Sequence, residues 1–409
     1  MKKHLIMLTV SLLLVACGDD KVEENSPAAA ESAPVEEGGT PSAPPFKVVA
    51  TCEVGYEPEG IALYKGHLFV ANTGGYAEQE FDHDFETTVS IINAATMTVE
   101  KTIDTGIPNL YGEMSQSGRY LCLNSPGDYY ETPPRGLILD CEKALNGEDC
   151  FVVFNYPATY NTTTLDGNFL AIGSSFSYIT GEYEFSQLTI NPRTMIETGG
   201  QSGLEQKLPG TLKSDFMGMS QPYGIYANPY SGYIYGTDAG SFEGAGYLYQ
   251  WSPEGVLLGK HKVYINPGHF LALPVGEATS GLEAERLIVC NEGLWQADNG
   301  CLSYFENGSV LSNQWFRDKN GMKLGDTPND IIQVNDNLIA IAVNWSNIVQ
   351  FISPDGKAVA ATEDIPNNRR LCSDGQYVYV TSYGHECETI NGTVYFDKGF
   401  VAKINIGDY

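Results

Sequence analysis

The stretch FDHDFE, residues 81–86, has the side chains best suited to metal chemistry in this chain of 409 residues. Asp82 and Asp84 carry carboxylates that Ca²⁺ prefers, and His83 between them carries an imidazole that transition metals prefer. Adjacent acids on a polar turn are more often solvated, and no C-x-x-C spacing accompanies them. The sequence therefore favours a solvated loop here, and we predict no metal site.

Recognised catalytic motifs are missing from the sequence. It contains no G-x-S-x-G or H-E-x-x-H, and its histidines beyond the N-terminal segment are few. We therefore predict a protein that is not an enzyme, while a hydrolase or lyase that assembles acids from several segments stays an alternative. The formal charge of -28 argues against a nucleic-acid partner, which requires clustered Lys and Arg.

Aromatic side chains recur near the tips of polar loops that separate short apolar runs. Such tips form an amphipathic contact surface for a planar or sugar-like ligand. The alternative for any single residue is that it packs against the edge of a sheet. The candidate ligand contacts in these loops are Tyr76, Phe81, Tyr129, Tyr130, Tyr178, Phe242, Trp295, Trp345, Tyr383 and His385.

A second set of polar residues follows closely on prolines. Their amides, hydroxyls and guanidinium group are suited to hydrogen bonds with ligand amides or hydroxyls, whereas each Asn taken alone is as well explained by capping of a loop. The candidates are Asn109, Tyr111, Tyr223, Asn329, Asn367 and Arg369.

The elements that must position these residues are short strands in a repeat. Runs such as HLFVAN, RGLILD and QYVYVTS alternate and are rich in β-branched and aromatic residues, which predicts strands. About four strands recur with each of seven prolines, and this predicts an all-β, seven-bladed β-propeller over residues 46–409, with an open pair of β-sandwiches as the alternative. The prolines are Pro58, Pro108, Pro157, Pro222, Pro267, Pro328 and Pro366.

The two ends of the repeat predict how the ring closes. FKVVATCEV, residues 46–54, is a strand left over before the first proline, and FVAKINI ends the last unit. An N-terminal strand that completes the last blade removes a free sheet edge. The aromatic loops and the proline segments then meet on one rim around the axis.

The N-terminal segment has the features of an export signal. Lys2 and Lys3 precede an apolar run, and LVAC, ending at Cys17, resembles the lipobox of bacterial lipoproteins. We therefore expect a signal peptide at 1–16, a lipid anchor on Cys17 and a flexible acidic, Pro-rich tether over 17–45. The acidic residues behind Cys17 resemble the signal that sends some lipoproteins to the outer face of the outer membrane, with a merely solvated spacer as the alternative.

Eight cysteines remain once Cys17 is assigned to the lipid. An even number in an exported chain permits disulfides, and buried reduced thiols are the alternative. The pairs close enough in sequence to join hairpins are Cys141–Cys150, Cys290–Cys301 and Cys372–Cys387.

Several stretches resemble a known family. PEGIALYKGHLFVANTGGY followed by TTVSIIN resembles the diagnostic blade of YVTN-type seven-bladed propellers. GDYYETPPRGLILD and the segment from NEGLWQADNG to NIVQFISPDGK are similar to surface lipoprotein propellers that capture cobalamin. In those relatives the NEG blade tends to come first, whereas here it is the fifth.

The resemblance implies a surface-exposed outer-membrane lipoprotein that binds cobalamin on the propeller rim and delivers it to a TonB-dependent outer-membrane transporter. Cobalamin would be a transported ligand, and no resident cofactor is expected. A glycan-binding accessory lipoprotein, in which the same aromatic residues stack on sugars, is the second hypothesis.

Overall fold

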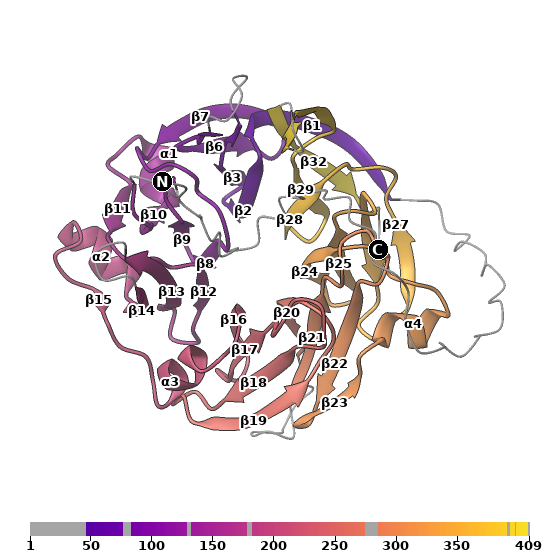
Figure 1. Cartoon of the computed structure of the whole chain (residues 1–409). Coiled ribbons are helices and arrows are strands. Elements are labelled where there is room, and N and C mark those ends of the chain that lie inside the picture. Colours follow the sequence, from indigo (N-terminus) through magenta and orange to yellow (C-terminus); the bar gives the residue numbers. More distant parts are fainter. Residues whose placement is uncertain are drawn as a thin grey trace, which may run out of the picture.

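Seven antiparallel four-stranded sheets surround a central axis in the described part of the chain (Figure 1). The structure is a computed structural model that describes residues 46–76, 83–128, 132–177, 182–274, 285–390, 393–396 and 398–407. The predicted all-β, seven-bladed propeller is confirmed. The sheets are called blades 1 to 7 in chain order of their innermost strands.

Each of the first six blades is built from four strands that follow one another from the axis outward. Blade 1 consists of β2 (Pro58–Tyr64), β3 (His67–Asn72), β6 (Thr88–Asn93) and β7 (Thr98–Asp104). Blade 2 has β8 (Ser115–Ser117), β9 (Tyr120–Ser125), β10 (Arg135–Asp140) and β11 (Phe151–Phe154), and blade 3 has β12 (Tyr160–Thr163), β13 (Phe169–Ser177), β14 (Glu182–Ile190) and β15 (Leu204–Glu205). Blade 4 has β16 (Pro222–Ala227), β17 (Ile234–Asp238), β18 (Tyr247–Trp251) and β19 (Leu257–Lys262). Blade 5 has β20 (Pro267–Ala272), β21 (Arg286–Asn291), β22 (Cys301–Glu306) and β23 (Ser309–Ser312), and blade 6 has β24 (Pro328–Asn335), β25 (Leu338–Val343), β26 (Ile348–Ile352) and β27 (Ala358–Ala361).

Blade 7 takes its outermost strand from the start of the propeller. It consists of β28 (Asn368–Ser373), β29 (Tyr377–Ser382), β32 (Lys398–Asn405) and β1 (Lys47–Tyr56). β1 pairs antiparallel with β32, with Lys47 opposite Asn405 and Cys52 opposite Val401. The predicted closure by an N-terminal strand is therefore confirmed.

The core is divided among the seven blade interfaces. Seven apolar clusters are present in the described residues, and each draws its side chains from two adjacent blades. β25 is buried at every position because both of its faces pack against neighbouring blades. This is why the middle strands read as continuous apolar runs, and why one blade cannot fold without its neighbours.

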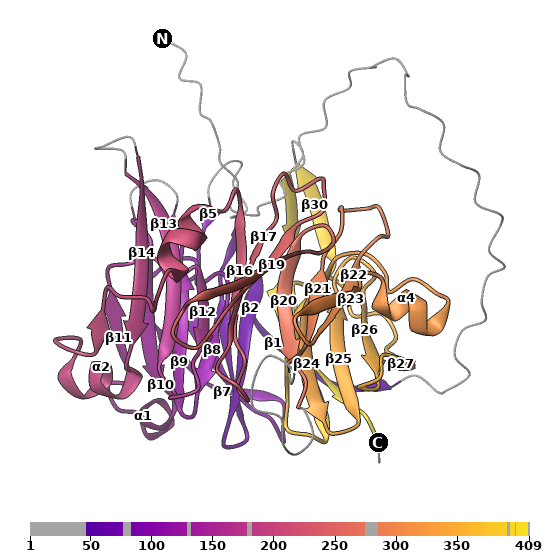
Figure 2. The ribbon, with the colours of Figure 1, turned by 90° about the horizontal axis from the view of Figure 1, so that it is seen from below.

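Four short helices and two small hairpins decorate the ring in the part described. The helices are α1 (Cys141–Asn146), α2 (Pro192–Thr198), α3 (Leu212–Met217) and α4 (Trp315–Asn320). The hairpins β4 (Gly75–Tyr76) with β5 (His83–Asp84), and β30 (Glu386–Ile390) with β31 (Thr393–Phe396), lie between the second and third strands of blades 1 and 7. β5 and β30 rise at one end of the molecule, opposite the end at which the C-terminus lies (Figure 2).

The seven prolines lie at or before the innermost strands, but not in one register. Pro58, Pro222, Pro267 and Pro328 are the first residues of β2, β16, β20 and β24, whereas the others precede their strands by more. The common feature in five blades is a residue with positive φ, at which the chain turns into the blade. These residues are Glu57 (φ 44), Asn109 (φ 59), Asn266 (φ 53), Thr327 (φ 55) and Asn367 (φ 45).

The described cysteines have free thiols, which is the second of the two possibilities left open by the sequence. Cys290 lies opposite Leu302 and Cys301 opposite Asn291, so the two thiols sit one register position apart and on opposite faces of the sheet. Cys141, Cys150 and Cys372 are free as well, and the side chain of Cys387 lies outside the described residues.

The signal peptide, Cys17 and the tether predicted over residues 1–45 also lie outside the described residues. Within the part described, no helix has both the length and the apolar character required to cross a membrane.

Candidate functional site

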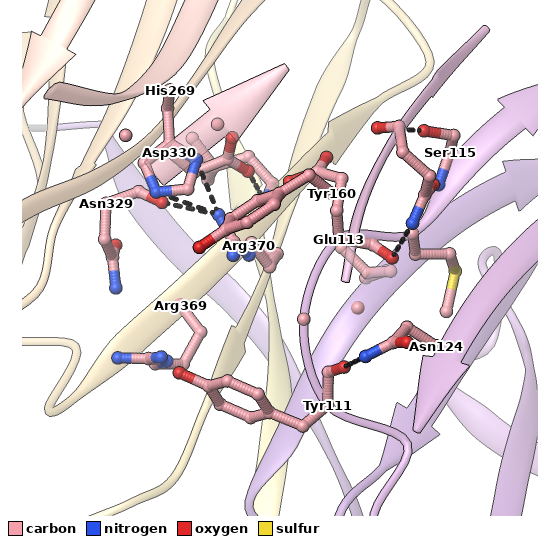
Figure 3. Close-up of a pocket in the computed structure, with 18 of the residues that line it drawn as sticks. Tyr111, Glu113, Ser115, Asn124, Tyr160, His269, Asn329, Asp330, Arg369 and Arg370 are labelled. Atoms are coloured by element: carbon pink, nitrogen blue, oxygen red, sulfur yellow. Dashed lines mark hydrogen bonds between the residues drawn. The ribbon is translucent and has the colours of Figure 1, made fainter. Parts of the chain in front are cut away.

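A pocket of about 680 Å³ occupies the propeller axis and is lined by residues of all seven blades. Its wall is formed by the innermost strands and the segments that lead into them, and it reaches loop residues such as Trp295 and Trp345 at the rim. Close to the axis, polar and charged side chains from blades 2, 3, 5, 6 and 7 converge (Figure 3). We call this cavity the axial pocket.

An ion cluster joins blades 1 and 7 beside the axial pocket. The carboxylate of Glu59 on β2 is fully buried, and it accepts hydrogen bonds from Arg369 Nε at 2.9 Å and from the Tyr383 hydroxyl at 2.7 Å. Arg370 Nε lies 3.3 Å from Glu59 Oε1. Burial alone would raise the pKa of Glu59, but the two guanidinium groups and the hydroxyl lower it to about 2. We call this group the seam cluster; it consists of Glu59, Arg369, Arg370 and Tyr383.

Arg370 extends the seam cluster to blades 5 and 6. One of its Nη1 hydrogens is directed at His269 Nδ1, 2.8 Å away, and Nη1 also donates to the carbonyl of Asn329 at 2.8 Å. The same Nη1 lies 3.2 Å from the other ring nitrogen, His269 Nε2. That nitrogen lies 3.6 Å from Glu292 Oε1.

Tyrosines from blades 3 and 4 complete the wall and use their hydroxyl protons within the protein. Tyr223 donates to Glu292 Oε2 at 2.7 Å, and Tyr160 donates to the carbonyl of Pro222 at 2.5 Å. Burial raises the pKa of both phenols, so they stay neutral donors.

Four carboxyl groups line the axial pocket itself. Asp330 accepts backbone hydrogen bonds from Ile331 and Leu371, whereas none of the described residues donates to the carboxyl groups of Glu57 and Glu113. Burial, reinforced by the nearby Glu59 and opposed by Arg369, raises the pKa of Glu57 to about 8. The pKa of Asp330 is also raised by burial, which Arg370 and His269 oppose. Glu292 is the fourth carboxyl group on the wall of the pocket.

Eight residues predicted from the sequence as ligand contacts line the axial pocket, and so does Asn329. Trp295 and Trp345 form an edge-to-face pair with ring centres 5.1 Å apart. The eight are Asn109, Tyr111, Tyr223, Trp295, Trp345, Asn367, Arg369 and Tyr383. Whether they bind a ligand stays a prediction.

Two of the predicted asparagines, Asn109 and Asn367, also have the capping role that was the alternative. The Asn109 amide donates to the Gly127 carbonyl at 3.0 Å, and the Asn367 amide donates to the Gly384 carbonyl at 2.9 Å. Each bond ties the segment before an innermost strand to the loop between the second and third strands of the same blade.

Two other predicted residues lie near the axial pocket but not on its wall. Phe242 packs edge-on against Tyr223 with ring centres 5.9 Å apart, so it supports the position of that tyrosine. His385 lies at a second hollow of about 390 Å³, which it shares with Trp345, Asn347, Pro366 and Asn367. The side chain of Tyr76 and all of Phe81, Tyr129, Tyr130 and Tyr178 lie outside the described residues.

The sequence reasoning missed the charged part of the site. Glu57 and Glu59 flank Pro58, and Arg370 follows Arg369, so their positions beside residues already noticed were the available signal. His269 was counted among the histidines but given no role. Glu113, Tyr160, Glu292 and Asp330 had no signal of their own, because their convergence depends on the ring.

The Asp82-His83-Asp84 loop lies only partly within the description. The backbones of His83 and Asp84 pair with β4, and their side chains and Asp82 lie outside it. In the residues described, no group of three or more His, Cys, Asp or Glu side chains is arranged to hold a metal ion.

Comparison with known proteins supports the fold alone. No protein-family model matches the chain, and no curated protein sequence is significantly similar to it. A chain in the crystal structure of the mitotic checkpoint complex aligns with 94% of this chain and 100% of its own length, at a TM-score of 0.54 and 10% identity. U3-55K aligns with 88% of this chain and 100% of its own length, at a TM-score of 0.50 and 11% identity. BamB from Moraxella catarrhalis aligns with 88% of this chain and 98% of its own length, at a TM-score of 0.44 and 11% identity.

Proposed function

We propose that this chain is a non-enzymatic binding protein of the cell surface, held in the outer membrane by a lipid on Cys17. It binds a corrinoid such as cobalamin at the rim of the axial pocket and delivers it to a TonB-dependent outer-membrane transporter. The observation that carries this proposal is the axial pocket of about 680 Å³, lined by all seven blades, with a pair of tryptophans at its rim.

The chemistry of the rim suits a large ligand with an apolar plane and polar arms. Trp295 and Trp345 are half-buried, so their rings keep apolar surface free for the plane or edge of a corrin. The peripheral amides of a corrinoid carry both donors and acceptors, which the carboxylates and the Asn and Tyr side chains of the pocket complement.

Binding rather than catalysis is favoured by the state of the charged groups. Arg369 and Arg370 already contact Glu59, and Arg370 is held further by the Asn329 carbonyl. A guanidinium group whose hydrogen atoms are taken by protein acceptors has fewer donors left for a charge that develops during a reaction. The alternative hydrolase or lyase is favoured only by the convergence of acids on the axis. Turnover or a stoichiometric metal in the purified protein would support that alternative.

Calorimetry with cyanocobalamin tests the proposal. Full-length protein in detergent is expected to bind at micromolar concentration, and Trp345→Ala is expected to weaken binding about tenfold because it removes an aromatic contact. Tyr230→Ala is the matched control, since Tyr230 is an exposed aromatic residue between β16 and β17 that lines neither hollow. Absence of heat with the unmodified chain contradicts the proposal.

A glycan-binding lipoprotein is the second candidate. It is favoured by the shallow hollow of about 390 Å³ in which Trp345 stands beside the amides of Asn347 and Asn367, a combination suited to sugar rings. Signal on a glycan array, without corrinoid binding, would decide in its favour.

A further inference from the structure

We propose that the interior of the axial pocket binds an organic cation, a ligand that ends in a protonated primary amine. The inference concerns the pocket below the rim and does not depend on corrinoid binding. It rests on the charges of the wall, on which hydrogen-bonding groups of the wall are already used, and on the aromatic rings between them.

The charges of the axial pocket do not balance. Glu57, Glu113, Glu292 and Asp330 line it together with Arg369 and Arg370, and both guanidinium groups contact Glu59 in the seam cluster. Glu59 offsets one of these two positive charges, and Glu113, Glu292 and Asp330 outnumber the one that is left. Glu57 keeps its proton up to about pH 8 and adds little charge at neutral pH. A concave site with low-dielectric walls concentrates the field of the remaining carboxylates, which attracts a cation.

Several donors close to the axis are used within the protein. Tyr160, Tyr223 and Tyr383 give their hydroxyl protons to Pro222, Glu292 and Glu59, and Arg370 donates to Asn329.

Acceptor capacity remains on the carboxyl groups. The backbone carbonyls of Glu113 and Glu57 accept hydrogen bonds from Asn161 and Thr73, but none of the described residues donates to their carboxyl groups. Glu292 Oε1 lies 3.6 Å from His269, beyond a normal hydrogen bond. A wall with unused acceptors is complementary to a ligand with several N–H donors, and a primary ammonium group has three.

Aromatic faces separate these acceptors. Tyr111, Tyr160 and Tyr223 come from blades 2, 3 and 4 and line the same cavity as Glu113 and Glu292. Figure 3 shows Tyr111 and Tyr160 among the charged side chains. Aromatic faces attract cations, and carboxylates beside them select a cation that can donate hydrogen bonds over a quaternary one.

Calorimetry with putrescine and with butanediol, its uncharged analogue, tests the inference. Full-length protein is expected to bind putrescine and not butanediol, and the affinity is expected to fall as salt is added, since the attraction is electrostatic. Glu113→Gln keeps the shape of the side chain and removes its charge, so it is expected to weaken putrescine binding about tenfold.

Glu254→Gln is the matched control, because Glu254 is an exposed acid between β18 and β19 that does not line the pocket. It is expected to bind putrescine like the unmodified chain. Equal binding of the diol, unchanged binding by Glu113→Gln, or no putrescine binding at millimolar concentration would each overturn the inference. Loss of cyanocobalamin binding alone would overturn only the proposed function.

Discussion

Two groups of acids around one axis have opposite environments. Glu59 in the seam cluster is fully buried and contacts two guanidinium groups and a phenol, whereas the carboxyl group of Glu113 across the axial pocket receives no hydrogen bond from the described residues. The first arrangement is typical of a structural ion cluster, because each charge is compensated within the protein. The second is suited to a ligand, because Arg370 attracts the Glu113 carboxylate but no described residue gives it a hydrogen bond, which a ligand can supply. The same residue type can thus stabilise the closure of the ring beside the pocket, at Glu59, or offer an acceptor to a ligand on its wall, at Glu113.

Removal of the compensated charge should have the largest effect. Glu59→Gln leaves Arg369 and Arg370 without their buried counter-charge, and breaking a buried pair in this way costs about 3–5 kcal/mol. Urea denaturation is expected to show this loss, with blades 7 and 1 most affected. A stability equal to that of Glu254→Gln would show that the seam cluster does not hold the closure.

The pH dependence of stability should separate the two kinds of acid. The pKa of Glu57 is raised to about 8, so the native state keeps a proton that the unfolded chain has lost above its ordinary pKa. Stability is therefore expected to fall from about pH 4.5 to about pH 8, by about 2 kcal/mol after allowance for water in the pocket. Glu59, with a pKa of about 2, acts in the opposite sense. The stability that it contributes to the fold is lost as the pH falls from the ordinary pKa of a glutamate, about 4.5, toward 2.

Thermal or urea unfolding as a function of pH measures this. Glu57→Gln is expected to make stability nearly independent of pH between 4.5 and 8. The loss of stability below about pH 4.5, which is due to Glu59, is expected to remain. An identical profile for the variant and the unmodified chain would contradict the assignment of this slope to Glu57.

Tyr223→Phe should have an intermediate effect. It removes the hydroxyl that donates to Glu292 at 2.7 Å, and a hydrogen bond to a charged group contributes about 1.5–3 kcal/mol at most when buried. Because Glu292 lines the open pocket, water can replace part of the lost bond, and we expect the free energy of unfolding to fall by about 1 kcal/mol. The freed oxygen should also bind putrescine more tightly, and a variant that binds it less tightly would contradict the unused-acceptor argument.

Glu113→Gln should have the smallest effect on stability and the clearest effect on binding. No described residue donates to its carboxylate, so the change is expected to stay within about 0.5 kcal/mol. The comparison with Glu59→Gln is sharp because the chemical change is the same on the wall of the pocket and beside it. A large loss of stability would show that Glu113 is a structural residue as well.

The sequence predicted the repeat, its four-stranded units and the closing strand, because each strand is recognisable from a local pattern of apolar residues and turns. β3 and β29 are apolar runs bounded by turns, and the proline segments mark the entry to each blade. The residues on these entry segments, such as Asn109, Tyr111 and Arg369, were accessible for the same reason, since a ring directs all entries to the axis.

Other features depend on partners far apart in the chain. Glu59 and Arg369 are 310 residues apart, and Tyr223 and Glu292 belong to different blades. The free thiols of Cys290 and Cys301 likewise follow from strand register rather than from their spacing.

The sequence by itself therefore determined the class of fold, the number of blades and the residues that enter the axis, since period-two patterns and turn residues act over a few positions. Only the tertiary structure decided which carboxylates are paired and which stay open. The physical reason is that charge compensation is set by distance in space, and closure of the ring brings the first and last blades together at the axis.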